Sequence, residues 1–421
     1  MRILYVSAYY YPDVVGGAES HLQQICERLA RRGHEVTVFT TDRSISSTLL
    51  SASDPPRLDA RQTLNLVRVR RFPPHGPFLG AVNAFLRLRG SYRLLRMFLS
   101  LEHIEVLSGG RFNLRAVAAA ALLRAQIVVV HNWCHPTLGY YGCLIRTLTR
   151  VPLVGIPLLH TEEDWSHSER LHAMLGQCDA LVTNTDYEKL FIETRGPGRR
   201  HVHVIPPGVD PESFLDRDGA HIRVRYGIGE APVVGYVGRM QPTKGVVKLL
   251  EAMKTVWRSD HRVRLLLAGR RFPASTQHDR EFQDALASLS ARDRSRVIHI
   301  DGFDDKEKSS IFDAMDIFAM PSTAESFGIA YLEAWMCRKP VVASRIGSTR
   351  CVVDDGVDGL LVDPNDSGGI AAAILQLLTD PQLARRMGSA GYEKTQAKFT
   401  WDTVTDQVER TFQNLIGASA R

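Results

Sequence analysis

Two glutamates, Glu325 and Glu333, lie eight positions apart in the segment PSTAESFGIAYLEAW at residues 321–335. Paired carboxylates can act as the general acid and base of a glycoside hydrolase. The same pair can instead accept hydrogen bonds from hydroxyl groups, as around a bound sugar nucleotide. A third interpretation is a strand-to-helix turn with a solvated face. The surrounding residues have to decide among the three.

Two cations, Arg239 and Lys244, lie in the segment GRMQPTKG, directly after the apolar strand candidate VVGYVG. Two positive charges at the end of a central strand are well placed to neutralise a diphosphate as it leaves. The segment is not a Walker A motif, which requires GxxxxGK followed by Ser or Thr. Taken alone, it would be interpreted as a solvated basic loop.

Glycines open two of the predicted helices. Gly328 follows the strand candidate IFAMP, and the backbone amides at Phe327 and Gly328 can point at an anion. Glu333 then falls within the helix, where a carboxylate can accept both hydroxyls of a ribose. Gly17 stands at a second helix start, where glycine lets the backbone approach a ligand closely. No GxGxxG dinucleotide fingerprint is present.

His160 ends another apolar run, in PLLHTEEDW, and Glu162 and Glu163 follow it closely. We favour a site role for His160 because the adjacent carboxylates offer contacts to acceptor hydroxyls. A histidine at the end of a core strand can also simply bond a neighbouring backbone group.

His131 is a further candidate on the acceptor side. Cys134 and His135 lie close to it, but no second ligand cluster at zinc spacing accompanies them. The sequence therefore predicts no metal site.

Short apolar runs alternate with amphipathic helical stretches along the chain, which predicts an α/β fold. One of the expected strands is LNLVRVRRF at 64–72. We predict two Rossmann-like, doubly wound parallel-sheet domains facing across a cleft. The expected divisions are an N-terminal domain over 1–207, a linker over 208–231, a C-terminal domain over 232–400, and a C-terminal helix over 401–421 that can pack back on the N-terminal domain or stay on the other.

The composition of the 421 residues is that of a soluble globular protein, with 44% hydrophobic and 23% charged residues. Six scattered cysteines without a CxxC pair favour a reducing compartment. The N-terminal MRILYVSAYY is predicted to be a strand and not a signal peptide, and no run is apolar and long enough to span a bilayer. We therefore expect a cytoplasmic protein, either free or peripheral at the inner face of the membrane.

A cluster of arginines makes an anionic membrane surface a candidate partner. On a helix over the Arg87–Arg96 region, Arg89 and Arg93 share one face and Leu88 and Tyr92 another, which is the pattern of a basic amphipathic helix. The alternative is an ordinary packed helix with a solvated basic face. Nucleic acid is not an expected partner, because no aromatic-interleaved basic motif or known binding module is visible.

Several segments together resemble a known enzyme family. GRMQPTKG, PSTAESFGIAYLEAWMCRKPVVAS, DGVDGLLVDPND and the N-terminal YYPDVVGGAESHLQQICERLARRGHEVTVFT are similar to retaining GT-B glycosyltransferases of family GT4, with the E-x7-E motif at Glu325 and Glu333. The resemblance implies a hexosyltransferase that moves a sugar from a nucleotide-diphosphate sugar to an acceptor hydroxyl. It implies retention of anomeric configuration and no metal or cofactor beyond the donor. UDP is the favoured nucleotide and GDP the next.

Donor-binding roles follow from the resemblance. Arg239 and Lys244 would bind the diphosphate, Glu333 the ribose hydroxyls, and Glu325 a hydroxyl of the sugar. The remaining donor-binding residues would be Ser326, Phe327, Gly328 and Ile329 on the same domain and Gly17 on the opposite one.

The resemblance also assigns the catalytic set, which is His160, Arg239, Lys244 and Glu325. His160 matches the family's histidine near the sugar and the acceptor. His131, Glu162 and Glu163 remain candidates for the acceptor side.

The chain departs from the family pattern in one loop. Where Gly-Gly-x-Pro-Glu is frequent, this chain has GSTRC, with Ser348, Arg350 and Cys351 in place of the second glycine, the proline and the glutamate. Arg338 likewise stands where glycine is frequent. These changes bear on the shape of the loop and leave the cations and both glutamates in place.

Two other functions compete with this interpretation. A glycosidase needs two carboxylates but has no use for a paired Arg/Lys phosphate site. A catalytically silent protein that binds sugar nucleotides, or associates with membranes, would carry the same motifs and transfer nothing.

Overall fold

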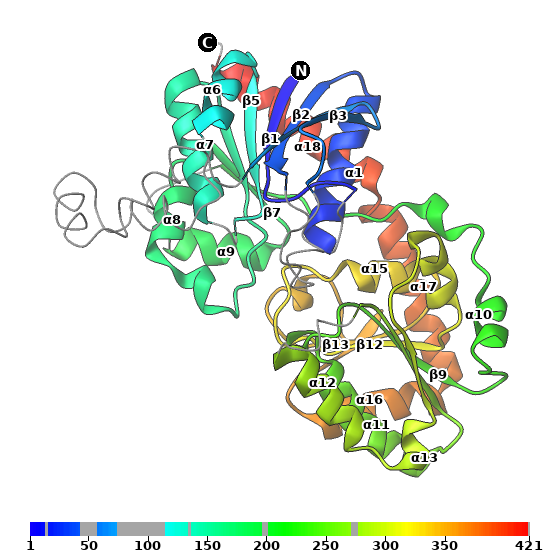
Figure 1. Cartoon of the computed structure of the whole chain (residues 1–421). Coiled ribbons are helices and arrows are strands. Elements are labelled where there is room, and N and C mark those ends of the chain that lie inside the picture. The colour runs from blue at the N-terminus through cyan, green and yellow to red at the C-terminus, as the bar shows by residue number, and fades with distance from the viewer. Residues whose placement is uncertain are drawn as a thin grey trace, which may run out of the picture.

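The computed structural model describes residues 1–12, 16–42, 57–73, 114–133, 136–195, 201–270 and 277–419. They form two lobes, each built on its own sheet, with the N-terminal lobe in blue to green and the C-terminal lobe in green to orange (Figure 1). Each lobe is a parallel α/β domain, as predicted. The Arg87–Arg96 region, Cys134 and His135 lie outside the described residues.

The N-terminal sheet has the strand order β3-β4-β2-β1-β5-β6-β7-β8. All of its pairings are parallel except that of β3 with β4. The strands are β1 (Arg2–Val6), β2 (Glu35–Thr41), β3 (Arg61–Leu64), β4 (Val67–Phe72), β5 (Ile127–His131), β6 (Leu153–Ile156), β7 (Ala180–Thr183) and β8 (His201–Val204).

The antiparallel edge corrects one prediction. The run LNLVRVRRF was expected to be one strand, but it is broken between Leu64 and Val67. Asn65 and Leu66 have φ angles of 47° and 71°, so the chain turns back on itself there and makes a hairpin. An apolar pattern alone does not reveal a two-residue turn that contains no glycine.

Helices cover both faces of this sheet. One face packs against α6 (Leu114–Leu122), α7 (Pro136–Thr149), α8 (Glu169–Leu175) and α9 (Asp186–Arg195), and the other against α1 (Gly17–Arg31) and α18 (Trp401–Ser419). Within β1, Leu4 and Val6 join the first core and Ile3 and Tyr5 the second. A strand buried on both faces reads as continuously apolar, which is why ILYV was recognisable as one.

The C-terminal sheet has the order β11-β10-β9-β12-β13-β14, and all of its pairings are parallel. Its strands are β9 (Val233–Val237), β10 (Arg264–Ala268), β11 (Val297–Ile300), β12 (Ile317–Met320), β13 (Val341–Ser344) and β14 (Gly359–Val362). The helices around it are α11 (Val246–Ser259), α12 (Gln277–Ala287), α13 (Ala291–Arg294), α14 (Lys308–Asp313), α15 (Ile329–Met336), α16 (Ser367–Thr379) and α17 (Pro381–Lys398).

The stretch 208–231, predicted as a linker, is structured. It contains α10 (Gly219–Arg225) and places Phe214 and Ile222 in the core of the C-terminal lobe. Arg217 also pairs with Asp313 of α14, at 3.2 Å. This stretch is therefore held against the C-terminal lobe.

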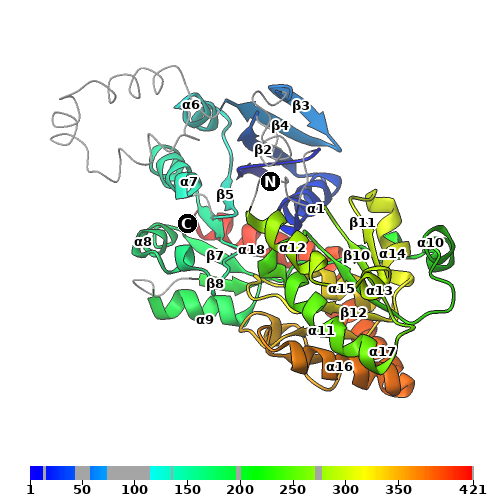
Figure 2. The same cartoon turned by 60° about the horizontal axis from the view of Figure 1, so that its bottom comes forward.

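The last helix, α18, returns to the N-terminal lobe and lies along α1 (Figures 1 and 2). Its buried face carries Trp401, Val404, Val408 and Phe412. Arg32, which follows α1, pairs with Glu409 of α18 at 3.0 Å. The sequence allowed this helix to pack on either domain, and it packs on the N-terminal one.

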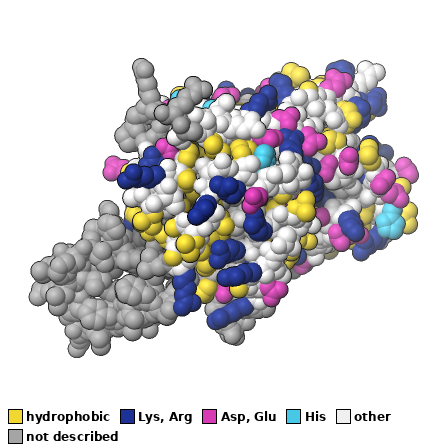
Figure 3. Space-filling model, turned by 90° about the horizontal axis from the view of Figure 1, so that it is seen from above, with side chains coloured by type: hydrophobic (Ala, Val, Ile, Leu, Met, Phe, Trp, Pro, Cys, Tyr) yellow, Lys and Arg dark blue, Asp and Glu magenta, His cyan; other side chains and the backbone are white. Residues whose placement is uncertain are grey.

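Surface charge is not confined to one place. On the face seen from above, Lys and Arg side chains stand among hydrophobic ones (Figure 3). None of the helices in the described part of the chain has both the length and the apolar character needed to cross a membrane.

Candidate active site

Two loops of the C-terminal lobe are joined side by side because their strands are neighbours in the sheet. β9 pairs with β12 in parallel, so the loops that leave their carboxyl ends meet. The Thr323 amide donates to the Thr243 carbonyl at 2.8 Å. Gly245, with φ of 79°, lies so close to Pro321 that a Cβ there would be 2.1 Å from its carbonyl oxygen. This contact brings the cationic loop against the first glutamate.

Lys244 and Glu325 form a buried ion pair at this junction. Lys244 Nζ lies 2.9 Å from Glu325 Oε1, and the two side chains are 15% and 7% exposed. Ser322 Oγ donates to the same oxygen at 2.9 Å. Burial opposes ionisation of Glu325, but Lys244 and then His160 lower its pKa overall. The carboxylate is therefore charged and held in place.

Arg239, predicted as the second diphosphate cation, is half-buried on the same loop. Its backbone carbonyl accepts a hydrogen bond from the Tyr236 hydroxyl at 2.7 Å. Among the residues that the structure describes, its guanidinium takes part in no hydrogen bond or ion pair. The described residues thus leave its side-chain donors available to an anion.

The start of α15 has the geometry expected of an anion-binding helix end. Gly328 is the N-cap with φ of 96°, and a Cβ there would lie 2.4 Å from Cε2 of Tyr331. The Phe327 ring is buried against Phe399, so only its backbone can face a ligand. Ser326 and Ile329 are half-buried on either side.

A second helix start lies opposite, from the other lobe. A Cβ on Gly17, the first residue of α1, would lie 3.4 Å from Cδ1 of Ile329. The amino ends of α1 and α15 therefore approach one point. The first amides of a helix have no partner within the helix, which favours negative charge there.

His160 follows β6 of the N-terminal lobe and is fixed by its own loop. Its Nδ1 lies 3.3 Å from Glu163 Oε1, and the Trp165 indole donates to Glu163 Oε2 at 2.6 Å. The His160 contact, above all, lowers the pKa of Glu163 to about 2, with Lys244 among the smaller causes. Glu163 is thus occupied in orienting His160.

Charged residues of each lobe influence carboxylates of the other lobe at this place. His160 acts on the pKa of Glu325 across the lobes, and Lys244 acts on that of Glu163. Desolvation raises the pKa of Glu162, and Glu325 adds to the rise. We call the set of Lys244, Glu325, His160, Glu162 and Glu163 the interlobe site.

Glu333 has a partner that the sequence did not suggest. Its Oε1 pairs with Nζ of Lys308, the first residue of α14, and its side chain is 12% exposed. Burial opposes the charge on Lys308, but Glu333 raises the pKa of Lys308 overall. No motif marks this lysine, because only the packing of α14 beside α15 brings it to the glutamate.

His131, a candidate for the acceptor side, is buried against α1. The ring is 1% exposed and its Nε2 lies 2.8 Å from Nδ1 of His21 on α1. The two rings stack at 5.1 Å, and burial lowers the pKa of His21 to about 4. In this structure His131 is a core residue, since its side chain has no exposed surface to offer an acceptor.

The divergent loop GSTRC is compatible with the site. Ser348, in place of a glycine, is buried and its Oγ donates to the Glu325 carbonyl at 2.6 Å. Gly347 packs against the ring of Tyr187 on α9. A Cβ on Gly347 would lie only 2.1 Å from that ring. Arg350 and Cys351 are exposed. The loop therefore holds the Glu325 backbone through Ser348 and contacts the other lobe through Gly347.

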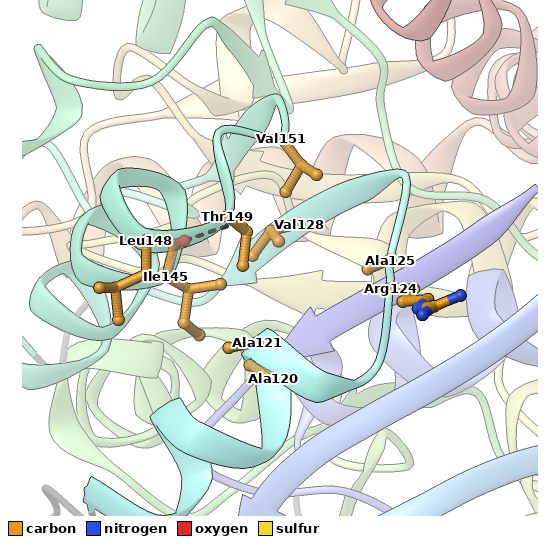
Figure 4. A pocket seen from close by; sticks show the side chains of 9 residues that line it. All are labelled: Ala120, Ala121, Arg124, Ala125, Val128, Ile145, Leu148, Thr149 and Val151. Carbon is orange, nitrogen blue, oxygen red and sulfur yellow. Dashed lines mark hydrogen bonds between the residues drawn. The ribbon is translucent and has the colours of Figure 1, made fainter.

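A pocket of about 320 Å³ lies elsewhere, between α6 and α7 (Figure 4). Arg124 is its only charged lining residue, and none of the predicted site residues borders it. Within the described part of the chain, no three His, Cys, Asp or Glu side chains gather as metal ligands would. The prediction that no metal is required stays a prediction.

Two facing parallel-sheet domains, with cations and glutamates at the strand ends where they meet, define the GT-B class of glycosyltransferase. Family models agree for each half: Glycosyltransferase Family 4 matches residues 15–213 and Glycosyl transferases group 1 matches residues 220–394.

Full-length relatives point the same way. A D-inositol 3-phosphate glycosyltransferase of Kineococcus radiotolerans is 30% identical, over 95% of this chain and 91% of its own. A glycogen synthase of Mycobacterium tuberculosis is 27% identical, over 98% and 94%. Anabaena HepE, solved with UDP-glucose, superimposes with a TM-score of 0.76 at 21% identity, over 98% and 100%. The chain belongs to the GT4 family of GT-B glycosyltransferases.

Proposed function

We propose that this glycosyltransferase moves a sugar from a nucleotide-diphosphate sugar to an acceptor hydroxyl with retention of anomeric configuration. The observation that carries the proposal is the buried Lys244–Glu325 pair. Against the effect of burial, Lys244 and then His160 of the opposite lobe lower the pKa of Glu325. A hydrolytic carboxylate pair would need a free acid and a free base. Here Glu325 is held charged by a lysine, and Glu333 is paired with Lys308.

The donor would lie mainly on the C-terminal lobe. Arg239, which has free donors, and Lys244 would bind the diphosphate, together with the amino ends of α15 and α1. Glu325 would accept a hydrogen bond from a sugar hydroxyl while keeping Lys244 in place. Glu333 would hold the ribose hydroxyls. As the bond to the sugar breaks, negative charge on the leaving phosphate would grow where these fixed cations already stand.

The acceptor would approach from the N-terminal lobe, beside His160. Glu163 is committed to His160 and Trp165, whereas Glu162 is exposed. Glu162 is therefore the better candidate for contact with an acceptor hydroxyl. The leaving phosphate oxygen would assist removal of the acceptor proton on the same face, so retention needs no second carboxylate as nucleophile.

The relatives bear on the donor base and on the acceptor class. UDP is the favoured base and GDP the next, and HepE is a protein of this fold with UDP-glucose bound. The relatives are named for different acceptors, inositol 3-phosphate and glycogen. A glycan, a lipid-linked or a small-molecule hydroxyl all remain candidates. Association of the Arg87–Arg96 region with an anionic membrane stays a prediction that liposome flotation tests.

A thermal-shift screen of nucleoside diphosphates and sugar nucleotides tests the donor first, because a ligand that binds only the native state raises its melting temperature. We expect UDP and one UDP-sugar to stabilise the protein most. Release of nucleoside diphosphate from that donor, with water or added acceptors, then tests transfer. Binding without any turnover, with every acceptor class tried, would favour the catalytically silent alternative.

A further inference from the structure

A buried carboxylate lies behind His160. Glu188, in the first turn of α9, is 1% exposed. Its Oε1 accepts a hydrogen bond from the Leu159 amide and its Oε2 accepts one from the Asn184 amide, both at 2.8 Å. One side chain thus ties the loop after β6, directly before His160, to the loop after β7.

Helix capping explains only half of this arrangement. The Glu188 amide donates to Thr185 Oγ1 at 3.1 Å, so Thr185 and Glu188 resemble a capping box, in which the glutamate reaches back to the helix start. The bond to Asn184 comes close to that role, since Asn184 directly precedes the capping residue Thr185. The bond to Leu159 does not, because Leu159 belongs to another loop and caps nothing.

The loop before His160 needs such a restraint. Leu158 has a φ of 56°, a left-handed conformation that is unfavourable for a leucine. Leu159 follows at once, and Glu188 holds its amide. His160 comes next and turns its Nδ1 toward Glu163. A shift of the Leu159 backbone would therefore carry the His160 ring with it.

We propose that Glu188 is a positioning residue for His160: by holding the Leu159 amide, its carboxylate sets where the imidazole lies in the interlobe site. The inference rests on the proposed role of His160. Glu188 itself touches no reacting atom. A misplacement of about 1 Å at a catalytic group can lower turnover about 100-fold, so a residue of this kind matters without contacting substrate.

Glu188→Gln is the informative variant, because it keeps the shape of the side chain but replaces one acceptor oxygen by an amide donor. Thr185→Ala is the matched control, since it removes the cap bond of the same helix and leaves Leu159 untouched. Release of UDP from UDP-glucose would be measured for both. We expect kcat to fall about tenfold or more in Glu188→Gln with KM nearly unchanged, and to stay near wild type in Thr185→Ala.

A double-mutant cycle separates positioning from general destabilisation. If Glu188 acts through His160, Glu188→Gln should lower the residual activity of His160→Ala no further. If Glu188→Gln lowers activity by the same factor in the wild type and in His160→Ala, the proposal is overturned. Wild-type activity in Glu188→Gln beside a defective His160→Ala would also overturn it and leave the proposed function standing. Wild-type activity in His160→Ala would remove the role of His160 and the proposal with it.

Amide hydrogen exchange gives a readout that does not depend on turnover. In the wild type the Leu159 amide should exchange slowly although it lies outside any strand, and the Glu188→Gln variant should lose that protection while Thr185→Ala keeps it. Exchange of the wild-type Leu159 amide at the rate of an open loop would overturn the proposal, whatever the variants do.

Discussion

Two glutamates lie near the start of α15, Glu325 in the loop before it and Glu333 inside it. Each is paired with a lysine, and the two pairs differ in what surrounds them. Lys244 and Glu325 have side chains 15% and 7% exposed and are coupled to His160 of the other lobe. Lys308 and Glu333 are 31% and 12% exposed. Lys308 is coupled to Glu333 and Asp305, which both belong to the C-terminal lobe.

We infer from this difference that the two glutamates of the E-x7-E motif have separate tasks. If the donor binds on the C-terminal lobe and the acceptor on the other, the pair influenced by both lobes would take part in the transfer. The pair confined to one lobe would hold the donor. We therefore expect substitutions at the Lys244–Glu325 pair to lower kcat, and substitutions at the Lys308–Glu333 pair to raise the donor KM.

The largest effect is expected for Lys244→Ala. Loss of a fixed cation beside the leaving phosphate should lower kcat about 100- to 1000-fold. The control is Lys248→Ala, because Lys248 forms an exposed pair with Glu251 on the neighbouring helix and should be dispensable. Turnover of the donor by purified, folded variants is the measurement.

Lys244→Ala also leaves Glu325 buried without its partner, which can destabilise the fold by about 3–5 kcal/mol. Circular dichroism and the melting temperature therefore accompany the assay. The combined Lys244→Met and Glu325→Gln variant removes both charges and should recover stability but not activity. Near-normal kcat in any of these variants would remove the interlobe pair from the mechanism.

An intermediate effect is expected at the other pair. Glu333→Gln should raise the donor KM about tenfold, equivalent to about 1.4 kcal/mol, and leave kcat nearly unchanged. Lys308→Met should raise the donor KM less, because this substitution only frees the Glu333 carboxylate to move. Glu307→Gln, which breaks an exposed pair with Arg225 next to Lys308, is the control. A loss of kcat as large as that of Lys244→Ala would erase the distinction between the two pairs.

A smaller effect is expected from Glu163. Its pKa lies at about 2 in the folded protein against an ordinary value of 4.5, so ionised Glu163 stabilises the fold above about pH 4.5 and ceases to do so as the pH falls through 2. Glu163→Gln should lower the melting temperature at pH 7 by about 1–2 °C, because the side chain is partly exposed. The difference should shrink toward pH 3. A constant difference across that range would contradict the His160–Glu163 assignment.

The smallest effect is expected from a chelator. If fixed cations and helix amides stabilise the leaving diphosphate, EDTA should change kcat by less than about twofold. Activity that disappears with EDTA and returns with magnesium would show that the cations of the C-terminal lobe do not suffice.

Much of the C-terminal lobe was predictable from its sequence. The strand before Arg239 and the helix after Gly328 lie where the apolar runs and the glycine placed them. Such local signals work because a parallel strand buried on both faces is continuously apolar, and because a helix start in the left-handed region favours glycine. The two-residue turn at Asn65 and Leu66 carries no such signal and was missed.

The partners of the site residues could not be predicted in the same way. Three of these partners belong to no motif, and each reaches the site from a helix whose position is set by packing. They are Lys308, Glu188 and Tyr187. The burial of His131 could not be predicted either. His131 was a reasonable candidate at the end of a strand, but α1 covers it and gives it His21 as a partner.

By itself, then, the sequence determined the alternation of strands and helices and the residue types that the chemistry requires: two cations, two glutamates and a histidine at strand ends. Those features are local, because they depend on apolar periodicity and on which side chains follow a strand. Only the tertiary structure decided that Lys244 pairs with Glu325 and Lys308 with Glu333, that Glu163 and not Glu162 orients His160, and that α18 crosses back to α1. Charge pairing and burial depend on distances between segments remote in the chain, and those distances exist only once both sheets have folded and the lobes have met.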